Sequence, residues 1–129
     1  MQLTLNMIKE ENAPAKIVDY FRFNFGNRTE VNEVFDSEHD INFIKFLIKK
    51  FPLYQTQKTF EYVLTLQPDY LYLFDLMLNV KAFQTQKNFD SIKEFGFDYI
   101  TMLIFVSQIK TLQTLENYEY VKTLKNTDK

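Results

Sequence analysis

Cysteine and tryptophan are absent from this chain of 129 residues, and glycine, proline and histidine are scarce. Without cysteine, neither a disulfide framework nor a thiolate site can form. The two glycines, Gly26 and Gly96, cannot supply a phosphate-binding P-loop or a dinucleotide-binding loop. Because there are also only three prolines, the chain lacks the turn residues that a fold of many short strands needs. The composition therefore favours helices joined by short turns.

His39 is the single histidine, which leaves few routes to catalysis. A zinc site would have to be built almost entirely from carboxylates, which is an unusual set of ligands. A Ser-His-Asp triad would need Ser37, Ser91 or Ser107, and none of them stands in a nucleophile-elbow sequence. We expect His39 to be an ordinary exposed residue in a turn. We accordingly expect no enzyme activity, no catalytic residue, no metal and no cofactor, with a carboxylate-based hydrolase or lyase as the least favoured alternative.

The charge of the chain is small, with a net value of −2. Its basic residues form no run longer than Lys49-Lys50, which argues against nucleic acid as a partner because phosphate contacts dominate that affinity. No apolar run reaches the roughly 18–20 residues of a membrane span, and no basic segment followed by an apolar run opens the chain. The sequence therefore predicts a cytoplasmic protein that does not enter the membrane.

A block of sequence recurs at a spacing of 29 residues. Residues 55–63 return as residues 84–92 and, more weakly, as residues 113–121. The pair Asp-Tyr at 69–70 also returns, as 98–99. A fixed period of this length is typical of stacked supersecondary units, none of which can bury its apolar face alone.

The first half of each block predicts a helix. Apolar residues recur at spacings of three and four, as in Phe60 and Val63, which places them on one helical face. Side-chain oxygens that can cap a helix start precede these residues at Thr56, Thr85 and Thr114. Asn27 falls at the same register, with Glu30 three residues later as a plausible capping box.

The second half of each block predicts another helix, beginning at a repeated aspartate. Asp40, Asp69 and Asp98 fall where a carboxylate favours the positive end of a helix dipole, so we interpret them as helix-start residues. Gly96 and Pro68 mark the corner between the two helices. Segments 69–80 and 99–106 are apolar nearly all round, which predicts helices buried among their neighbours.

The two ends of the chain depart from the repeat. Residues 14–25 predict one more helix, which begins at Pro14 and ends at Gly26. Residues 1–7 alternate between apolar and polar side chains, which fits either a frayed end or an edge strand that pairs with another chain. Residues 8–13 are expected to be a polar connector, and residues 123–129 a fraying polar tail.

Together these patterns predict an all-α fold of about seven or eight short helices, arranged as a short solenoid of three helical hairpins with atypical end helices. The whole chain is expected to be one domain. Its predicted parts are an N-terminal extension (1–13), a capping helix (14–25), three repeats (26–54, 55–83 and 84–112), and a terminal helix with its tail (113–129).

Two groups of side chains are candidates for binding a partner protein. The first group is a cluster of acidic residues near the first repeated aspartate. It could instead be a solvated acidic edge or a weak cation site. The second group consists of aromatic residues off the apolar stripes, which could instead seal gaps between neighbouring hairpins. The candidates are Glu30, Glu33, Asp36, Glu38, Asp40, Tyr54, Tyr62, Phe83 and Tyr120.

The favoured function is a protein–protein interaction module, because helical repeats offer extended surfaces and seldom an enzyme pocket. Lysine supplies all but two of the 15 basic residues, and asparagine, isoleucine, phenylalanine and tyrosine are frequent, which suggests an AT-rich genome. A phage or mobile-element inhibitor that binds a host protein through its acidic and aromatic face would fit this background. The alternative is a self-assembling homo-oligomer, joined through residues 1–7 or an uncapped terminal hairpin.

Overall fold

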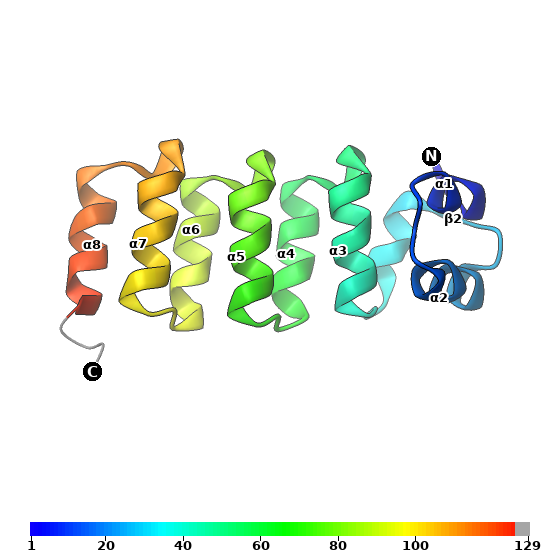
Figure 1. Cartoon of the computed structure of the whole chain (residues 1–129), viewed down its shortest axis with the longest axis horizontal. Coiled ribbons are helices and arrows are strands. Elements are labelled where there is room, and N and C mark those ends of the chain that lie inside the picture. Colours follow the sequence, from blue (N-terminus) through cyan, green and yellow to red (C-terminus); the bar gives the residue numbers. More distant parts are fainter. Residues whose placement is uncertain (126–129) are drawn as a thin grey trace. The chain divides into compact units, whose positions relative to one another are not determined.

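The computed structural model describes residues 1–125, most of which are helical, as expected for an all-α chain. Tail residues 126–129 lie outside the described part. The α-helices are α1 (Leu5–Glu10), α2 (Ala15–Phe25), α3 (Ile41–Lys50), α4 (Gln57–Thr65), α5 (Tyr70–Asn79), α6 (Gln86–Ile92), α7 (Tyr99–Gln108) and α8 (Leu115–Lys125) (Figure 1). The 3₁₀ helices are η1 (Val31–Asp36), η2 (Pro52–Tyr54), η3 (Lys81–Phe83), η4 (Lys93–Phe95) and η5 (Lys110–Leu112), and the strands are β1 (Gln2–Thr4) and β2 (Arg28–Glu30).

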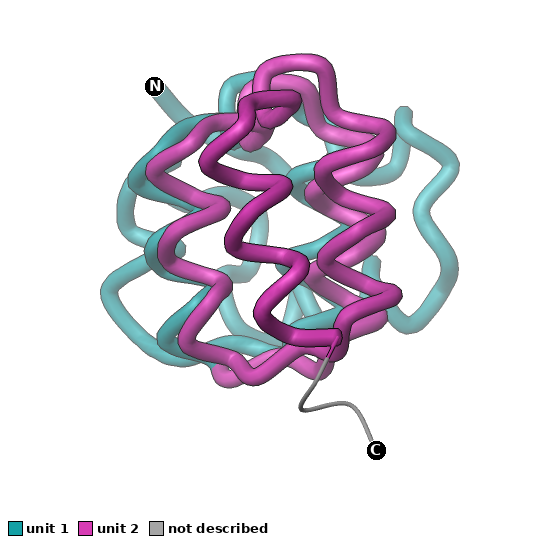
Figure 2. The backbone as a smooth tube through the Cα atoms, turned by 90° about the vertical axis from the view of Figure 1, so that its left-hand side faces the viewer, with its two compact units in different colours: residues 1–66 teal, residues 67–129 magenta. Residues whose placement is uncertain are grey.

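The chain divides into two compact units, residues 1–66 and residues 67–129 (Figure 2). In the second unit, α5 packs against α7, and α7 packs against α8. Their axes run nearly parallel, with the fainter α6 behind α5 and α7 (Figure 1). In the first unit, α1 packs against α2 and α2 against α3. No helix within residues 1–125 has the length and apolar character that crossing a membrane requires.

The repeated aspartates begin helices, as the sequence predicts. The Asp40 carboxylate accepts hydrogen bonds from the backbone N–H groups of Asn42 and Phe43 at 3.0 and 3.1 Å. The carboxylates of Asp69 and Asp98 each accept one hydrogen bond, at 2.9 Å, from the backbone N–H of the residue three positions later. These bonds satisfy N–H groups that have no partner inside the helix.

The repeated threonines cap the other set of helices in the same way. The hydroxyls of Thr56, Thr85 and Thr114 each accept from the backbone N–H three residues onward, at 3.2–3.3 Å. Behind the first two caps Phe60 and Phe89 are both 0% exposed, and Val63, Ile92 and Val121 are buried at one shared register position. The caps and this buried position therefore recur at the same 29-residue spacing as the sequence, whereas Tyr118 stays 37% exposed at the register of Phe60 and Phe89.

The frayed-end alternative for residues 1–7 and the expected helix start of the first repeat are wrong. The strand-like alternation is confirmed over Gln2–Thr4, because β1 pairs antiparallel with β2 of the same chain, with Leu3 opposite Thr29. The predicted connector 8–13 is partly helical, since α1 extends to Glu10. Asn27 caps no helix; its carbonyl accepts a hydrogen bond from the Leu5 N–H at 2.8 Å.

The physical reason is that the N-terminal side chains are buried by contacts with residues that are distant in the sequence. Leu3 and Ile8 are fully buried, so the N-terminal segment contributes to the core and holds β2 in an extended conformation. Val34 keeps the core position of the repeat at 0% exposure, although it lies in η1 rather than in an α-helix. Apolar contacts with residues distant in the sequence have thus overridden the local helix pattern.

Two further expectations need correction. Helices α5 and α7 are not buried all round, because Leu71 is 61% exposed and Ile100 is 56% exposed. The sequence predicts a fraying tail from residue 123, but residues 123–125 belong to α8.

The left-handed corner residues allow a matched test of backbone strain. Gly96 has φ +72°, and the equivalent residue one period earlier, Gln67, has φ +53°. A side chain at Gly96 would meet no atom within 4 Å, so only the backbone conformation would penalise it. We expect Gly96→Ala to lower the free energy of unfolding by about 1 kcal/mol, and Gln67→Gly to raise it by about 0.5–1 kcal/mol. Chemical denaturation measures both changes, and a gain of stability in Gly96→Ala would contradict the assignment.

Candidate functional site

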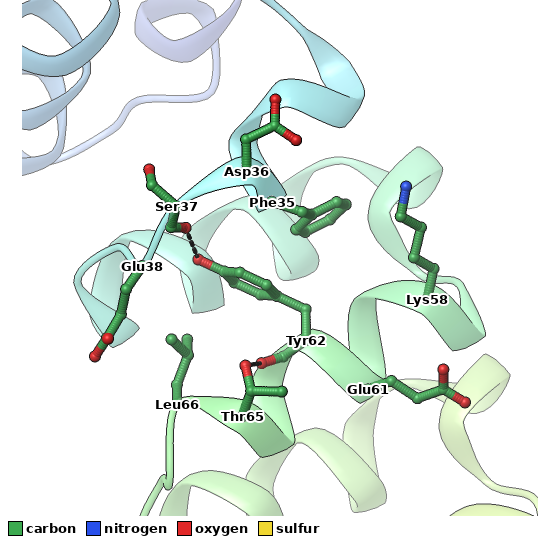
Figure 3. A pocket seen from close by; sticks show the side chains of 9 residues that line it. All are labelled: Phe35, Asp36, Ser37, Glu38, Lys58, Glu61, Tyr62, Thr65 and Leu66. Atoms are coloured by element: carbon green, nitrogen blue, oxygen red, sulfur yellow. Dashed lines mark hydrogen bonds between the residues drawn. The ribbon is translucent and has the colours of Figure 1, made fainter.

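A cleft of about 610 Å³ in the first unit gathers several of the candidate side chains (Figure 3). One wall comes from the end of η1 and the loop after it, and the other comes from one face of α4. The lining residues are Phe35, Asp36, Ser37, Glu38, Lys58, Glu61, Tyr62, Thr65 and Leu66.

Tyr62 lies at the centre of this cleft and ties its two walls together. Its hydroxyl donates a hydrogen bond to the Ser37 carbonyl at 2.8 Å and accepts one from the His39 N–H at 3.2 Å. Its ring packs on Phe35, with 4.8 Å between the ring centroids. Burial raises the pKa of Tyr62, so the hydroxyl stays protonated and keeps its donor role. The rings of Phe35 and Tyr62, which form the aromatic floor of the cleft, are therefore held in place by contacts within the chain.

Carboxylates surround this aromatic floor. Asp36 and Glu38 are exposed on one wall, and Glu61 is exposed on the other (Figure 3). The one basic side chain of the lining, Lys58, places its ammonium 5.7 Å from the centroid of the Phe35 ring. Three carboxylates against one ammonium make the cleft acidic, which attracts cationic groups.

His39 lies beside the cleft, and its expected exposure is wrong. The residue is only 8% exposed and packs against the rings of Phe25 and Phe43. Its Nδ1 lies 2.8 Å from the Tyr20 hydroxyl, and its Nε2 lies 3.2 Å from the Ser37 hydroxyl. The corner before α3 is therefore held by side chains from α2 as well as from α4.

Each ring nitrogen of His39 thus faces a hydroxyl group. In a neutral imidazole one ring nitrogen donates and the other accepts, so one of these hydroxyls donates to His39 and the other accepts from it. The Tyr20 hydroxyl also accepts a hydrogen bond from the Asp40 N–H at 3.0 Å, which ties α2 to the start of α3.

Removing the histidine should flatten the dependence of stability on pH. Burial lowers the pKa of His39 below its ordinary value of 6.5. The unfolded chain then binds a proton at higher pH than the folded chain, so stability is fully present above pH 6.5 and declines as the pH falls below it. We expect the free energy of unfolding to decrease from pH 7.5 to 5.5 in the wild type and to change less in His39→Gln. Equal slopes in the two proteins would contradict the assignment.

The structure brings together three of the nine predicted binding residues: Asp36, Glu38 and Tyr62. Two other acidic candidates have structural partners elsewhere. Glu30 accepts a hydrogen bond from Gln2 at 3.2 Å and pairs with the N-terminal amine, and these contacts lower its pKa. Asp40 caps α3, as described above. Glu33 is exposed on η1 but does not line the cleft.

The remaining aromatic candidates are packed, as the gap-sealing alternative proposed. Tyr54 is 1% exposed and donates to the Val31 carbonyl at 3.0 Å, while burial raises its pKa. Phe83 is 0% exposed. Tyr120 is half-buried, with the Lys93 ammonium 4.4 Å from its ring centroid. Tyr54 and Phe83 therefore expose almost no surface to a partner, whereas Tyr120 remains partly exposed.

The sequence analysis identified Tyr62 on α4 but not the other side chains that this helix contributes to the cleft. Lys58, Glu61, Tyr62 and Thr65 follow the spacing of three and four that defines a helical face. This face lies beside the apolar stripe of α4, and the same periodicity could have identified it. That Phe35 would meet this face could not have been read from spacing, because η1 was expected to be an α-helix.

Within residues 1–125, no group of three or more histidine, aspartate or glutamate side chains is arranged to hold a metal ion. No family model, curated protein or solved structure matches the chain.

Proposed function

We propose that this chain is a protein–protein interaction module that binds a basic segment of its partner in the acidic cleft between η1 and α4. The observation that supports this most directly is the placement of three carboxylates, Asp36, Glu38 and Glu61, around the aromatic floor. Each of them is exposed to solvent, and Glu61 also accepts a hydrogen bond from the Gln57 amide at 3.1 Å.

The two kinds of side chain in the cleft suit the two parts of an arginine or lysine. A guanidinium can form paired hydrogen bonds with one carboxylate, and it can also stack on an aromatic ring. The apolar stem of either side chain can cover Phe35 and Tyr62. Because Tyr62 is already held by two hydrogen bonds, little additional ordering is needed on binding.

The wider proposal is that the 29-residue hairpins stack as a short cytoplasmic solenoid, which would present this cleft on a rigid scaffold. Its biological form would be a phage or mobile-element inhibitor that occupies the nucleic-acid site of a host protein. Such sites carry the arginines and lysines that contact phosphates, and an acidic cleft would compete for them.

Reversing the charge of the cleft should greatly weaken binding. The partner is first captured from extracts of the native host with the wild-type chain as bait, and its dissociation constant is then measured by titration. We expect Asp36→Lys, Glu38→Lys and Glu61→Lys together to raise the dissociation constant by about 100-fold, if each reversal costs about 1 kcal/mol. For the wild type, affinity should also fall as salt concentration rises.

The control applies the same change in net charge at acidic residues that do not line the cleft. Glu10, Glu11 and Asp19 changed together to lysine should leave the dissociation constant within about threefold of the wild-type value. An unchanged constant in the cleft variant, or an equal loss in both variants, would refute binding in the cleft.

A further inference from the structure

The second unit carries an apolar surface that its own fold does not cover. Leu71 on α5 and Ile100 on α7 are more than half exposed, as noted above. Four more apolar side chains on these helices are partly exposed and lie at helical spacings of three, four or seven residues from them. We call these six residues the α5/α7 face: Leu71, Phe74, Leu78, Ile100, Leu103 and Ile104.

The two helices present this face as one continuous surface. They pack against each other, with Phe74 contacting Phe105 across the seam at 5.3 Å between ring centroids. Figure 1 shows α5 and α7 side by side, with α6 behind them. Asp75 is the one charged residue in the sequence of either helix, and its carboxylate accepts a hydrogen bond from the Asn79 amide at 2.6 Å.

The repeat holds polar side chains at the equivalent positions of another helix. The positions equivalent to Leu71, Phe74 and Leu78, one period earlier on α3, hold asparagine and two lysines: Asn42, Lys45 and Lys49. A helix of this type therefore forms with polar side chains at the same positions. The apolar character of the α5/α7 face consequently points to a contact outside the unit.

Charges at the two ends of the face identify its occupant. Exposed aspartates, Asp69 and Asp98, precede α5 and α7, and exposed lysines, Lys81 and Lys110, follow them. One end is therefore acidic and the other basic. A second copy turned by a two-fold axis brings the acidic end of one face against the basic end of the other, so the charges are self-complementary.

The acidic end also offers a hollow that suits a lysine. Between the starts of α5 and α7 lies a cleft of about 500 Å³, whose lining includes the rings of Tyr70 and Phe97 together with Asp69 and Asp98. The two rings contact edge to face, with 6.3 Å between their centroids. A lysine ammonium can pair there with a carboxylate while its stem covers the rings.

We propose that the α5/α7 face binds the same face of a second copy of this chain, in an antiparallel two-fold arrangement in which α5 of each copy lies against α5 of the other and α7 against α7. Asp69 then meets Lys81 of the second copy, and Asp98 meets its Lys110. This arrangement brings the two Asp75 residues together near the two-fold axis, where their like charges weaken the dimer. This surface is separate from the acidic cleft, so the proposal goes beyond the function proposed above.

The size of the face sets the expected strength of the dimer. Helices of 10 residues are about 15 Å long, and two neighbours about 10 Å apart make a face of roughly 15 by 20 Å. Two such faces give roughly 600 Å² in projection, which is smaller than a standard protein–protein interface and is the size of a weak, transient contact. The dimer should therefore dissociate on dilution, with a dissociation constant in the micromolar range of about 1–100 μM.

Sedimentation equilibrium of the full chain between about 1 μM and 1 mM tests this proposal. The wild type should change from monomer to dimer across the range, and no larger species should form. Leu71→Glu with Ile100→Glu should stay monomeric throughout, with the wild-type melting temperature, because both positions are exposed. Lys81→Glu with Lys110→Glu should weaken the dimer at least tenfold, and this variant leaves every core and cap residue in place.

Phe23→Glu is the matched control, since Phe23 is 90% exposed and belongs to α2 of the first unit, not to the six residues of this face. It should dimerise like the wild type. The proposal is overturned if the wild type is monomeric at the highest concentration, if its dimer survives both double variants, or if the chain forms an open series of larger oligomers. A monomeric chain whose α5/α7 face instead binds a different protein would also overturn the assignment to a second copy.

Discussion

Phe89→Ala is expected to lower the free energy of unfolding by about 3–5 kcal/mol, the range for removing a buried phenylalanine. Phe89 is 0% exposed on α6, and its ring lies 6.3 Å from that of Tyr120. Small domains are stabilised by only about 5–15 kcal/mol in total, so the variant should be close to unfolding at room temperature. Urea denaturation followed by circular dichroism measures the change.

The repeat supplies a control for this substitution. Tyr118 occupies the register position of Phe89 one period later, but it is 37% exposed. We expect Tyr118→Ala to cost only about 1 kcal/mol, because much of its ring already contacts water. Similar losses at the two positions would contradict the account in which register and burial together determine stability.

Asn88→Ala is the second substitution with a large expected effect. Asn88 is fully buried, and its amide donates to the Phe83 carbonyl at 3.0 Å. Asn117 repeats the contact one period later, donating to the Leu112 carbonyl at 2.8 Å. Alanine would leave the Phe83 carbonyl without this donor and open a small cavity, so we expect a loss of about 2–3 kcal/mol. Thermal and urea unfolding of the purified variant measure this loss.

An exposed asparagine in the same unit controls for the loss of an amide hydrogen bond. Asn79 donates to the Asp75 carbonyl at 2.9 Å, but it is exposed to solvent. Asn79→Ala should change stability by no more than about 0.5 kcal/mol, because water replaces the lost partner. If the two alanine variants were equally stable, burial would not be the reason for the effect at Asn88.

Local features of the fold could be predicted from the sequence. The caps at Asp69 and Thr85 depend on backbone groups within three residues, and buried positions such as Val63 depend on helical periodicity. Such contacts are encoded within a few turns of chain. The pairing of β1 with β2 joins residues more than 20 apart, and no local pattern near Asn27 reveals it. The burial of His39 depends similarly on Tyr20 and Tyr62, which come from different helices.

The candidate site was only partly predictable for the same reason. The sequence identifies Asp36, Glu38 and Tyr62 as unusual residues, but it places them in two separate groups. The structure joins them because the Tyr62 hydroxyl binds the Ser37 carbonyl, a contact across 25 residues of sequence. The α5/α7 face was misread, because apolar periodicity alone does not show whether Leu71 meets another helix or solvent.

The most direct test of the proposed function is chemical-shift mapping of the isotopically labelled chain with the partner that it captures. Binding in the acidic cleft predicts that the largest backbone amide shifts fall in residues 35–38 and 58–66. They should disappear when Asp36, Glu38 and Glu61 are changed to lysine. Unchanged cleft amides, with the largest shifts in residues 71–78 and 100–104 instead, would contradict the proposal.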